Sequence, residues 1–245
     1  MAPEPDVASD RVVAPRNAAS LVIVECGPAE PRVLLGKRRP TQTFAPGKYV
    51  FPGGGLDPSD SELATSRRLA EHDRFALSRD PGPESAHLTP EAFALAAIRE
   101  TFEETGLVIG SAGPETVALA PAAWRPLVAL GVGPNIEALS FIARAITPPG
   151  RPRRFDARFF IADAAAISHR VADNDGEFEQ IDWFGFAAAR ALDLHGMTRS
   201  ILNEAQRFMA LSASERSVAP VPFYFESDQG WHQSRILRQA NTLGT

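Results

Sequence analysis

Three glutamates within five residues are the side chains of this sequence best suited to chemistry. Glu100, Glu103 and Glu104 lie in the segment 95–107, LAAIRETFEETGL. At about 100° per residue, a helix places the three carboxylates on one face. The bulky apolar residues fall on the opposite face: Leu95, Ile98 and Phe102. The segment is therefore predicted to be a helix that packs on one side and presents three negative charges on the other.

Clustered negative charges favour a bound cation. Like charges one turn apart cost on the order of 0.2–0.5 kcal/mol per pair on an exposed helix, and more in a partly closed groove. Arg99 can pair with Glu103, but one guanidinium cannot neutralise three carboxylates. A hard divalent cation such as Mg²⁺ binds carboxylate, water and phosphate oxygens together. On spacing alone, a solvated acidic helix face is the alternative.

A glycine-rich turn upstream favours the binding site over the solvated face. Three glycines, residues 53–55, follow Phe51 and Pro52, and Gly106 follows the glutamates directly. Glycines let backbone approach a ligand closely and offer N–H donors to phosphate oxygens. Metal ions between an acidic helix and phosphate groups would neutralise the phosphates, orient them and lower the pKa of bound water.

The elements that must position these residues follow from local patterns. Thr89 is predicted to cap a helix that has Pro90 at its first position, runs to Thr105 and stops at Gly106. Strands are predicted at 19–26, 32–38, 49–51, 107–109, 126–132, 137–146, 154–162 and 179–184, and further helices at 61–77, 186–193 and 197–213. Strands with interspersed helices predict an α/β sandwich.

Composition narrows the function classes. The 245 residues carry 25 Lys+Arg and 30 Asp+Glu, a formal charge of −5, which argues against a nucleic-acid coat protein. Neither a run of about 18 apolar residues nor a secretory signal is found, so we expect no membrane partner and a cytoplasmic location. The single cysteine, Cys26, excludes an intrachain disulfide and is expected at or near the core.

The chain is expected to form one folded unit. Residues 1–17 are predicted to be a flexible tail, and residues 18–245 a single domain. Within that domain, about 214–245 are expected to be an irregular C-terminal extension.

The acidic helix resembles the second half of the Nudix box, G-x5-E-x7-R-E-U-x-E-E-x-G-U, in which U is a bulky apolar residue. Residues 99–107 match it, with Thr101 at the first U position. Gly54 takes the place of the box glycine, and Asp60 stands six residues on, where the family has Glu. Residues 61–98 then separate Asp60 from Arg99 in place of the usual seven, so the box carries an insertion.

This split box resembles the coenzyme A diphosphatase branch of the family, as does the lead-in, VLLGKR at 33–38 and APGKYVFPGG at 45–54. The resemblance spans roughly residues 18–190. It implies an α/β/α sandwich with a mixed sheet and metal-dependent hydrolysis of the pyrophosphate bond in a nucleoside diphosphate linked to another moiety. Coenzyme A or acyl-CoA is favoured. The alternatives are an ADP-ribose or NADH pyrophosphatase and a non-catalytic Nudix-fold regulator that binds a nucleotide. The oligomeric state is open, a homodimer included.

The resemblance also implies roles for the box residues. Glu103 and Glu104 would be ligands of Mg²⁺ or Mn²⁺, and Glu100 would be a ligand or the base that deprotonates water. Arg99 would hold Glu103 in place, and Gly54 would contribute backbone geometry. The number of metal ions is left open.

A further acid is expected from a late loop, because similar proteins often supply one shortly before a Trp-bearing strand. Glu177 stands six residues before Trp183, with Glu179 as the runner-up. The general base is thus Glu100, Glu177 or Glu179.

Arginines predict the substrate contacts. Arg151, Arg153 and Arg154 cluster before an apolar strand, and Arg38 follows the second strand. The planar guanidinium suits phosphate recognition, and coenzyme A carries a 3′-phosphate besides its diphosphate. A solvated basic turn is the alternative for the cluster at 151–154.

Overall fold

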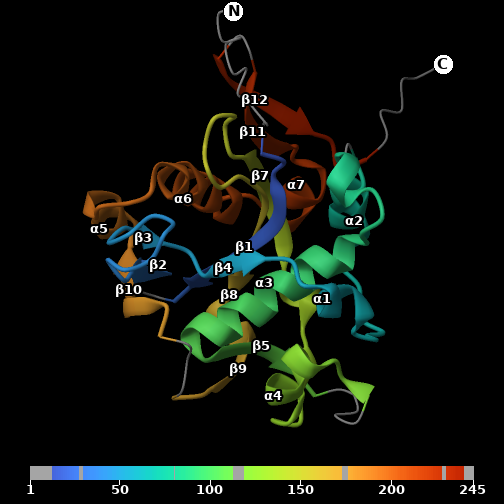
Figure 1. Cartoon of the computed structure of the whole chain (residues 1–245). Helices are drawn as coiled ribbons and strands as arrows, with labels where there is room; N and C mark the ends of the chain where they lie inside the picture. Colours follow the sequence, from blue (N-terminus) through green and yellow to red (C-terminus); the bar gives the residue numbers. More distant parts are fainter. Residues whose placement is uncertain are drawn as a thin grey trace, which may run out of the picture.

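A mixed β-sheet forms the centre of the computed structural model, which describes residues 13–27, 30–79, 81–112, 119–172, 176–227 and 230–239. Its main strands lie in the order β10-β2-β1-β8-β7-β11-β12 (Figure 1). They are β1 (Arg16–Glu25), β2 (Arg32–Arg38), β7 (Ser140–Ile146), β8 (Phe155–Asp163), β10 (Phe178–Gly185), β11 (Val221–Ser227) and β12 (Gly230–Ile236). The β1–β8 and β7–β11 pairs are parallel and the other pairs antiparallel, which confirms the α/β class with a mixed sheet.

Two short strands complete the sheet next to β1 and β2. Strand β3 (Tyr49–Val50) pairs with β2, and β4 (Gly53–Gly55) pairs with the first half of β1. Strand β2 pairs with β1 only at the C-terminal end of β1. Strand β4, here called the glycine strand, pairs with the first half of β1 instead. A separate small sheet joins β6 (Gly133–Pro134), β5 (Leu107–Ser111) and β9 (Ile167–Arg170).

Side-chain alternation along β1 divides the core into two layers. Leu21 and Ile23 pack in the layer that contains helix α3 (Pro90–Thr105), whereas Val22 and Val24 pack in the layer that contains α6 (Gly196–Met209). Because successive side chains of a strand point to opposite faces, α3 and α6 cover opposite faces of the sheet. The predicted sandwich is therefore the observed one.

Helix α3 begins and ends where the sequence predicts. The Thr89 side chain accepts a hydrogen bond from the Ala92 N–H, and Pro90 occupies the first turn. Gly106 ends the helix in the left-handed region at φ 70°, where a Cβ would lie 2.1 Å from the carbonyl oxygen of Val171. Only glycine fits this position, so the cap fixes where the glutamates stand relative to β5.

Several other expectations are wrong in detail. The helix predicted at 61–77 is two short helices, α1 (Pro58–Glu62) and α2 (Glu71–Leu77). The strand predicted at 126–132 is instead helix α4 (Arg125–Val128), because a short apolar run does not distinguish strand from helix and Pro126 suits a first helical turn. The remaining short helices are α5 (Phe186–Ala191), η1 (Pro83–Ser85), η3 (Ala122–Trp124), η4 (Ile136–Ala138) and η5 (Ala164–Ala166).

The chain ends also depart from the prediction. The extension at 214–245 is not irregular, because it holds α7 (Ala213–Val218), β11 and β12. A proline such as Pro222 normally argues against a central strand, because it lacks an N–H to donate. Here β11 pairs with β7 at Phe223 and Tyr224, the two residues that follow the proline. Residues 16 and 17 belong to β1 rather than to a tail; residues 1–12 and 240–245 lie outside the described residues.

Cys26 is exposed rather than near the core, since β1 ends at Glu25 and the thiol follows it. In the part of the chain that the structure describes, every helix is too short or too polar to cross a bilayer.

A buried ion pair ties the C-terminal segment to the insertion. Arg238 is 3% exposed and donates to Asp73 of α2, which is fully buried. The same guanidinium donates to the carbonyl oxygens of Ala219 and Phe141. One side chain therefore joins α2, β7 and the two ends of the C-terminal hairpin.

Removing that guanidinium should destabilise the protein. Replacing Arg238 by Leu leaves the Asp73 carboxylate buried without its partner, and we expect the free energy of unfolding to fall by about 3–5 kcal/mol. Urea denaturation measures it, with exposed Arg235→Gln as the charge-matched control. Equal stability of the two variants would contradict the structural role of the pair.

Candidate active site

The glycine strand β4 lets side chains of α3 reach the opposite side of the sheet. A Cβ at Gly54 would lie 2.4 Å from the Oε2 atom of Glu100, so any larger residue would displace that carboxylate. At Gly53 (φ 148°) the backbone N–H donates to Glu104 Oε2 at 2.8 Å. The two glycines thus position one glutamate each.

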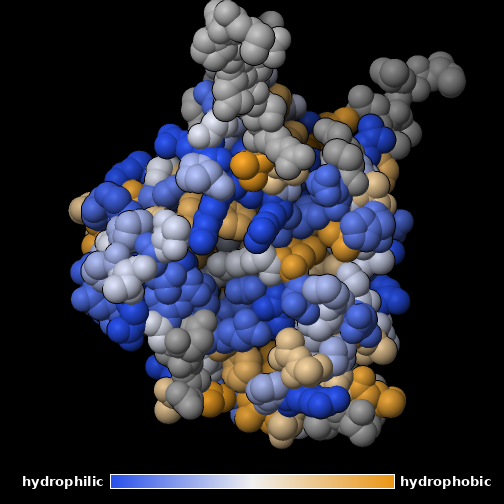
Figure 2. Space-filling view, in the orientation of Figure 1, coloured by the Kyte–Doolittle hydropathy of each residue, from blue (hydrophilic) through white to orange (hydrophobic). Residues whose placement is uncertain are grey.

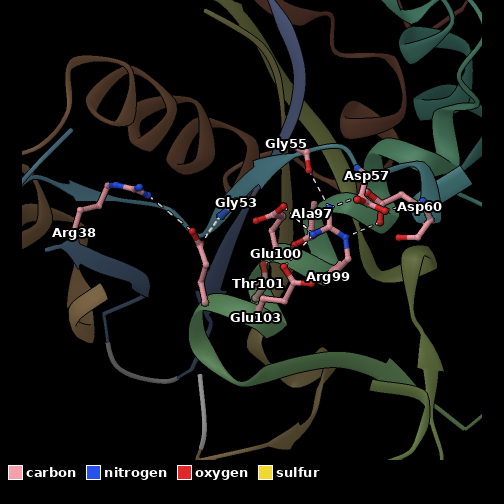
Figure 3. Close-up of polar contacts among 12 residues, drawn as sticks. Arg38, Gly53, Gly55, Asp57, Asp60, Ala97, Arg99, Glu100, Thr101 and Glu103 are labelled. Atoms are coloured by element: carbon pink, nitrogen blue, oxygen red, sulfur yellow. Dashed lines mark hydrogen bonds and ion pairs between the residues drawn. The ribbon is translucent and has the colours of Figure 1, made fainter. Parts of the chain in front are cut away.

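Arg99 is the centre of the acidic cluster (Figure 3). Its Nε and Nη2 atoms bind both carboxylate oxygens of Asp60, at 2.8 and 2.9 Å, and Nη2 also donates to the Gly55 carbonyl at 2.9 Å. Its Nη1 donates to Glu100 at 2.8 Å and to Glu103 at 3.0 Å. One buried guanidinium therefore joins α1, β4 and α3.

Asp60, which stands where the Nudix box has Glu, is 1% exposed and is bound by Arg99. It also accepts a hydrogen bond from the Asp57 N–H at the start of α1, 2.9 Å away. The side chain thus anchors Arg99 rather than lining the cavity described next.

A cavity of about 1070 Å³ opens beside β4. Its acidic lining comprises Glu100, Glu104 and Glu177, and its basic lining Arg38, Arg151 and Arg153. No described residue of the insertion at 61–98 lines it. Figure 2 shows that the molecular surface around α3 and β4 is mainly hydrophilic, whereas hydrophobic residues gather lower on the same face, over α4.

Arg38 bridges two of the acidic residues from the loop side. Its guanidinium donates to Glu177 and lies 3.9 Å from Glu104, while its Nε donates to the Phe44 carbonyl at 2.8 Å. Of the two acids predicted near Trp183, Glu177 therefore lies in the site. Glu179 pairs with Lys37 at 3.1 Å and does not line the cavity.

Burial and mutual repulsion raise the proton affinity of two glutamates. Burial raises the pKa of Glu104 well above its usual value, and the negative charges of Glu177 and Glu100 raise it further. Burial also raises the pKa of Glu100 to about 7; the Arg99 guanidinium partly offsets this, and Glu103 adds to it. When ionised, the five carboxylates that Arg38 and Arg99 contact at the glycine strand carry more negative charge than these two guanidiniums neutralise.

The donor set fits a hard divalent cation chemically. Within the described residues, no three acidic, histidine or cysteine side chains converge closely enough to hold a metal ion, because Glu100 and Glu103 bind Arg99 while Glu104 binds Gly53. The donors are nevertheless all carboxylate oxygens, they carry excess negative charge, and they lie against a strand without side chains. Hard cations take such oxygen ligands.

The predicted arginine cluster divides into two kinds of residue. Arg151 and Arg153 are exposed and line the cavity. Arg154 is 9% exposed and donates to the carbonyl oxygens of Thr147, at 2.9 Å, and Val13, at 2.7 Å. Its guanidinium thus binds backbone at the start of β8, and its role as a substrate contact stays a prediction.

Three cavity residues carry no motif that sequence reasoning could have used. Phe44 and His195 line the cavity with ring centroids 5.1 Å apart. Tyr224 lines it from the C-terminal strand β11, and its hydroxyl donates to Glu204 at 2.8 Å. They come from segments far apart in sequence, so only the fold brings them together.

Comparison with known proteins shows which proteins this chain is similar to. No family model matches the chain. It is 34% identical over 176 residues to the human protein named acyl-coenzyme A diphosphatase NUDT19, covering 53% of this chain and 47% of that one. The chicken protein of the same name is 30% identical over 206 residues, covering 64% and 54%. The chain thus spans about half the length of these curated relatives.

A solved structure shares the fold. The crystal structure of a Nudix hydrolase from Alicyclobacillus acidocaldarius aligns with 78% of this chain and 90% of its own, at 25% identity and a TM-score of 0.57. The chain is therefore similar to Nudix hydrolases in both sequence and fold. The resemblance expected from residues 99–107 is confirmed, and the insertion in this Nudix box lies away from the cavity.

The raised pKa of Glu100 predicts a pH-dependent stability for the metal-free protein. A carboxyl whose folded pKa is about 7, against 4.5 ordinarily, contributes stability that is complete below about pH 4.5 and is lost as the pH rises through about 7. In Glu100→Gln, the free energy of unfolding should fall by up to about 3 kcal/mol less over this pH range than in the wild type. Urea denaturation in chelator across that range measures it.

The matched control is Glu62→Gln, an exposed carboxyl on α1. A pH dependence of unfolding identical in Glu100→Gln and Glu62→Gln would show that Glu100 titrates normally.

Proposed function

We propose that this protein is a metal-dependent Nudix hydrolase that cleaves the pyrophosphate bond of coenzyme A or an acyl-CoA. The observation that carries the proposal is the pair formed by half-buried Glu100 and buried Glu104, held against the glycine strand in a large cavity. Such a site repels an anionic diphosphate unless cations lie between them.

The residues proposed to hold Mg²⁺ or Mn²⁺ are Glu100, Glu103 and Glu104. A cation bound there would supply charge neutralisation for the diphosphate and a lowered pKa for a bound water. Arg99 holds Glu100 and Glu103 on the helix face, and the Gly53 N–H holds Glu104. These contacts orient the carboxylates before substrate arrives.

The proton acceptor in the hydrolysis is proposed to be Glu177 or Glu100. Both line the cavity, and Glu177 approaches from the loop before β10, where Arg38 holds it. A carboxylate that takes the proton of the attacking water must be within hydrogen-bond reach of it. Glu179 is not proposed, because its partner is Lys37 and it lies outside the cavity lining.

Coenzyme A is favoured as the substrate for two reasons. The cavity of about 1070 Å³ is at the upper end of small-molecule sites, which suits a large dinucleotide-like substrate. The human and chicken relatives are named acyl-coenzyme A diphosphatases. ADP-ribose and NADH are the competing substrates. A cytoplasmic location and a homodimer stay predictions.

A substrate panel tests the activity. The protein is incubated with coenzyme A, acyl-CoA, NADH, ADP-ribose and dinucleoside polyphosphates, with Mg²⁺, Mn²⁺ or chelator, and mass spectrometry identifies the bond broken. We expect metal-dependent cleavage of coenzyme A into adenosine 3′,5′-bisphosphate and 4′-phosphopantetheine. No turnover of any member at micromolar enzyme would refute the proposal, and metal-independent binding without product would indicate a regulator.

The roles assigned to the site residues predict losses of hydrolysis rate that differ in size from one variant to the next. Glu104→Gln should lower the rate by roughly 10²–10³-fold, since it removes a proposed ligand, and Glu177→Gln should lower it more than Glu179→Gln does. Circular dichroism checks that each variant is folded. A wild-type rate in Glu104→Gln would contradict its assignment.

A further inference from the structure

A second, smaller cleft adjoins the basic side of the main cavity. It encloses about 340 Å³ and is lined by Val13, Ala14, Arg16, Pro152, Arg153, Arg154 and Phe155. Arg153 and Phe155 line both spaces, so the cleft continues the cavity. Arg16, to which the sequence assigns no role, is thereby brought beside Arg153.

Strand register places Arg16 at the end of a row of cavity residues. Ser20 and Ala18 of β1 line the main cavity, and Arg16 stands two residues before Ala18, on the same face of the strand. Ser20 pairs with Gly53 of the glycine strand, whereas Arg16 pairs with Phe155 of β8. At about 3.3 Å per residue, the row from Ser20 to Arg16 spans roughly 13 Å.

No carboxylate of the described residues neutralises the positive charge at this end. Arg16, Arg151 and Arg153 are exposed, and none of them forms an ion pair with a carboxylate among the described residues. Arg154, in contrast, is buried and bound to backbone carbonyls. The site is therefore acidic at the glycine strand and basic beyond it, which suits a ligand with negative groups in two separate places.

Aromatic rings lie between the two ends. The Arg38 guanidinium, at the acidic end, lies 5.9 Å from the centroid of Phe44. Phe44 in turn packs edge-on against Phe155 at the basic end, with centroids 5.6 Å apart, and against His195. Aromatic side chains stack on nucleobases, so the base has a surface to stack on while its ribose lies between the two charged ends.

We propose that Arg16, Arg151 and Arg153 form a second phosphate site, which binds a phosphate monoester on the ribose of the substrate, apart from the diphosphate at the glycine strand. The proposal rests on the proposed function and specifies its substrate class as nucleotides with a phosphorylated ribose. Guanidinium groups bind phosphate through paired, charge-assisted hydrogen bonds.

Coenzyme A and dephospho-CoA differ only in that phosphate, so their ratio of kcat/KM measures its recognition. We expect the double variant Arg16→Gln/Arg153→Gln to lower the ratio at least about tenfold, through KM rather than kcat, because the contact is remote from the reacting phosphorus. Arg170→Gln, an exposed arginine on β9, is the control and should leave the ratio unchanged.

Calorimetry separates this proposal from the proposed function. Adenosine 3′,5′-bisphosphate and AMP are titrated into the wild type and the same variants, and the double variant should weaken binding of the bisphosphate about tenfold more than binding of AMP. Equal weakening of both ligands, or no weakening, overturns the second phosphate site. Selective weakening in a protein that hydrolyses neither coenzyme A nor dephospho-CoA would uphold the site and refute the proposed hydrolysis.

Discussion

The buried ion pair between Arg99 and Asp60 is the interaction on which the rest of the site depends. Both side chains are almost fully buried, so each charge needs the other. The same guanidinium binds the Gly55 carbonyl, Glu100 and Glu103, and so sets the distance between the glycine strand and the acidic face of α3. The aspartate in place of the family's glutamate still reaches Arg99, because α1 starts directly after β4 and brings it close.

The glycine strand solves a geometrical problem of the sandwich. Helix α3 packs on one face of the sheet, yet Glu100 and Glu104 line a cavity whose floor is the other face. The three glycines of β4 lie next to the first half of β1. Because they have no side chains, the carboxylates of Glu100 and Glu104 can extend past this strand into the cavity. The same absence of side chains leaves the Gly53 N–H available to hold Glu104.

The insertion and the C-terminal segment stabilise the fold away from the chemistry. Arg238 joins the C-terminal hairpin to Asp73 of the insertion, and Arg158 donates to Pro81 and Ser85 of the same insertion. The C-terminal segment also reaches the cavity through Tyr224, on the strand that extends the sheet beyond β7.

The charge of the cavity lining changes from acidic at the glycine strand to basic at Arg151 and Arg153.

The sequence by itself determined helix α3, its cap at Thr89, its stop at Gly106 and the shared face of its glutamates, because helical spacing and capping act within a few residues. It also predicted the similarity to Nudix hydrolases, through motifs of the same local kind. Only the tertiary structure decided that Glu177 rather than Glu179 lines the cavity, that Arg154 binds backbone carbonyls, and that Arg16 and Arg153 line one cleft. Those contacts depend on strand pairing between distant segments, and local pattern carries no information about which strands pair.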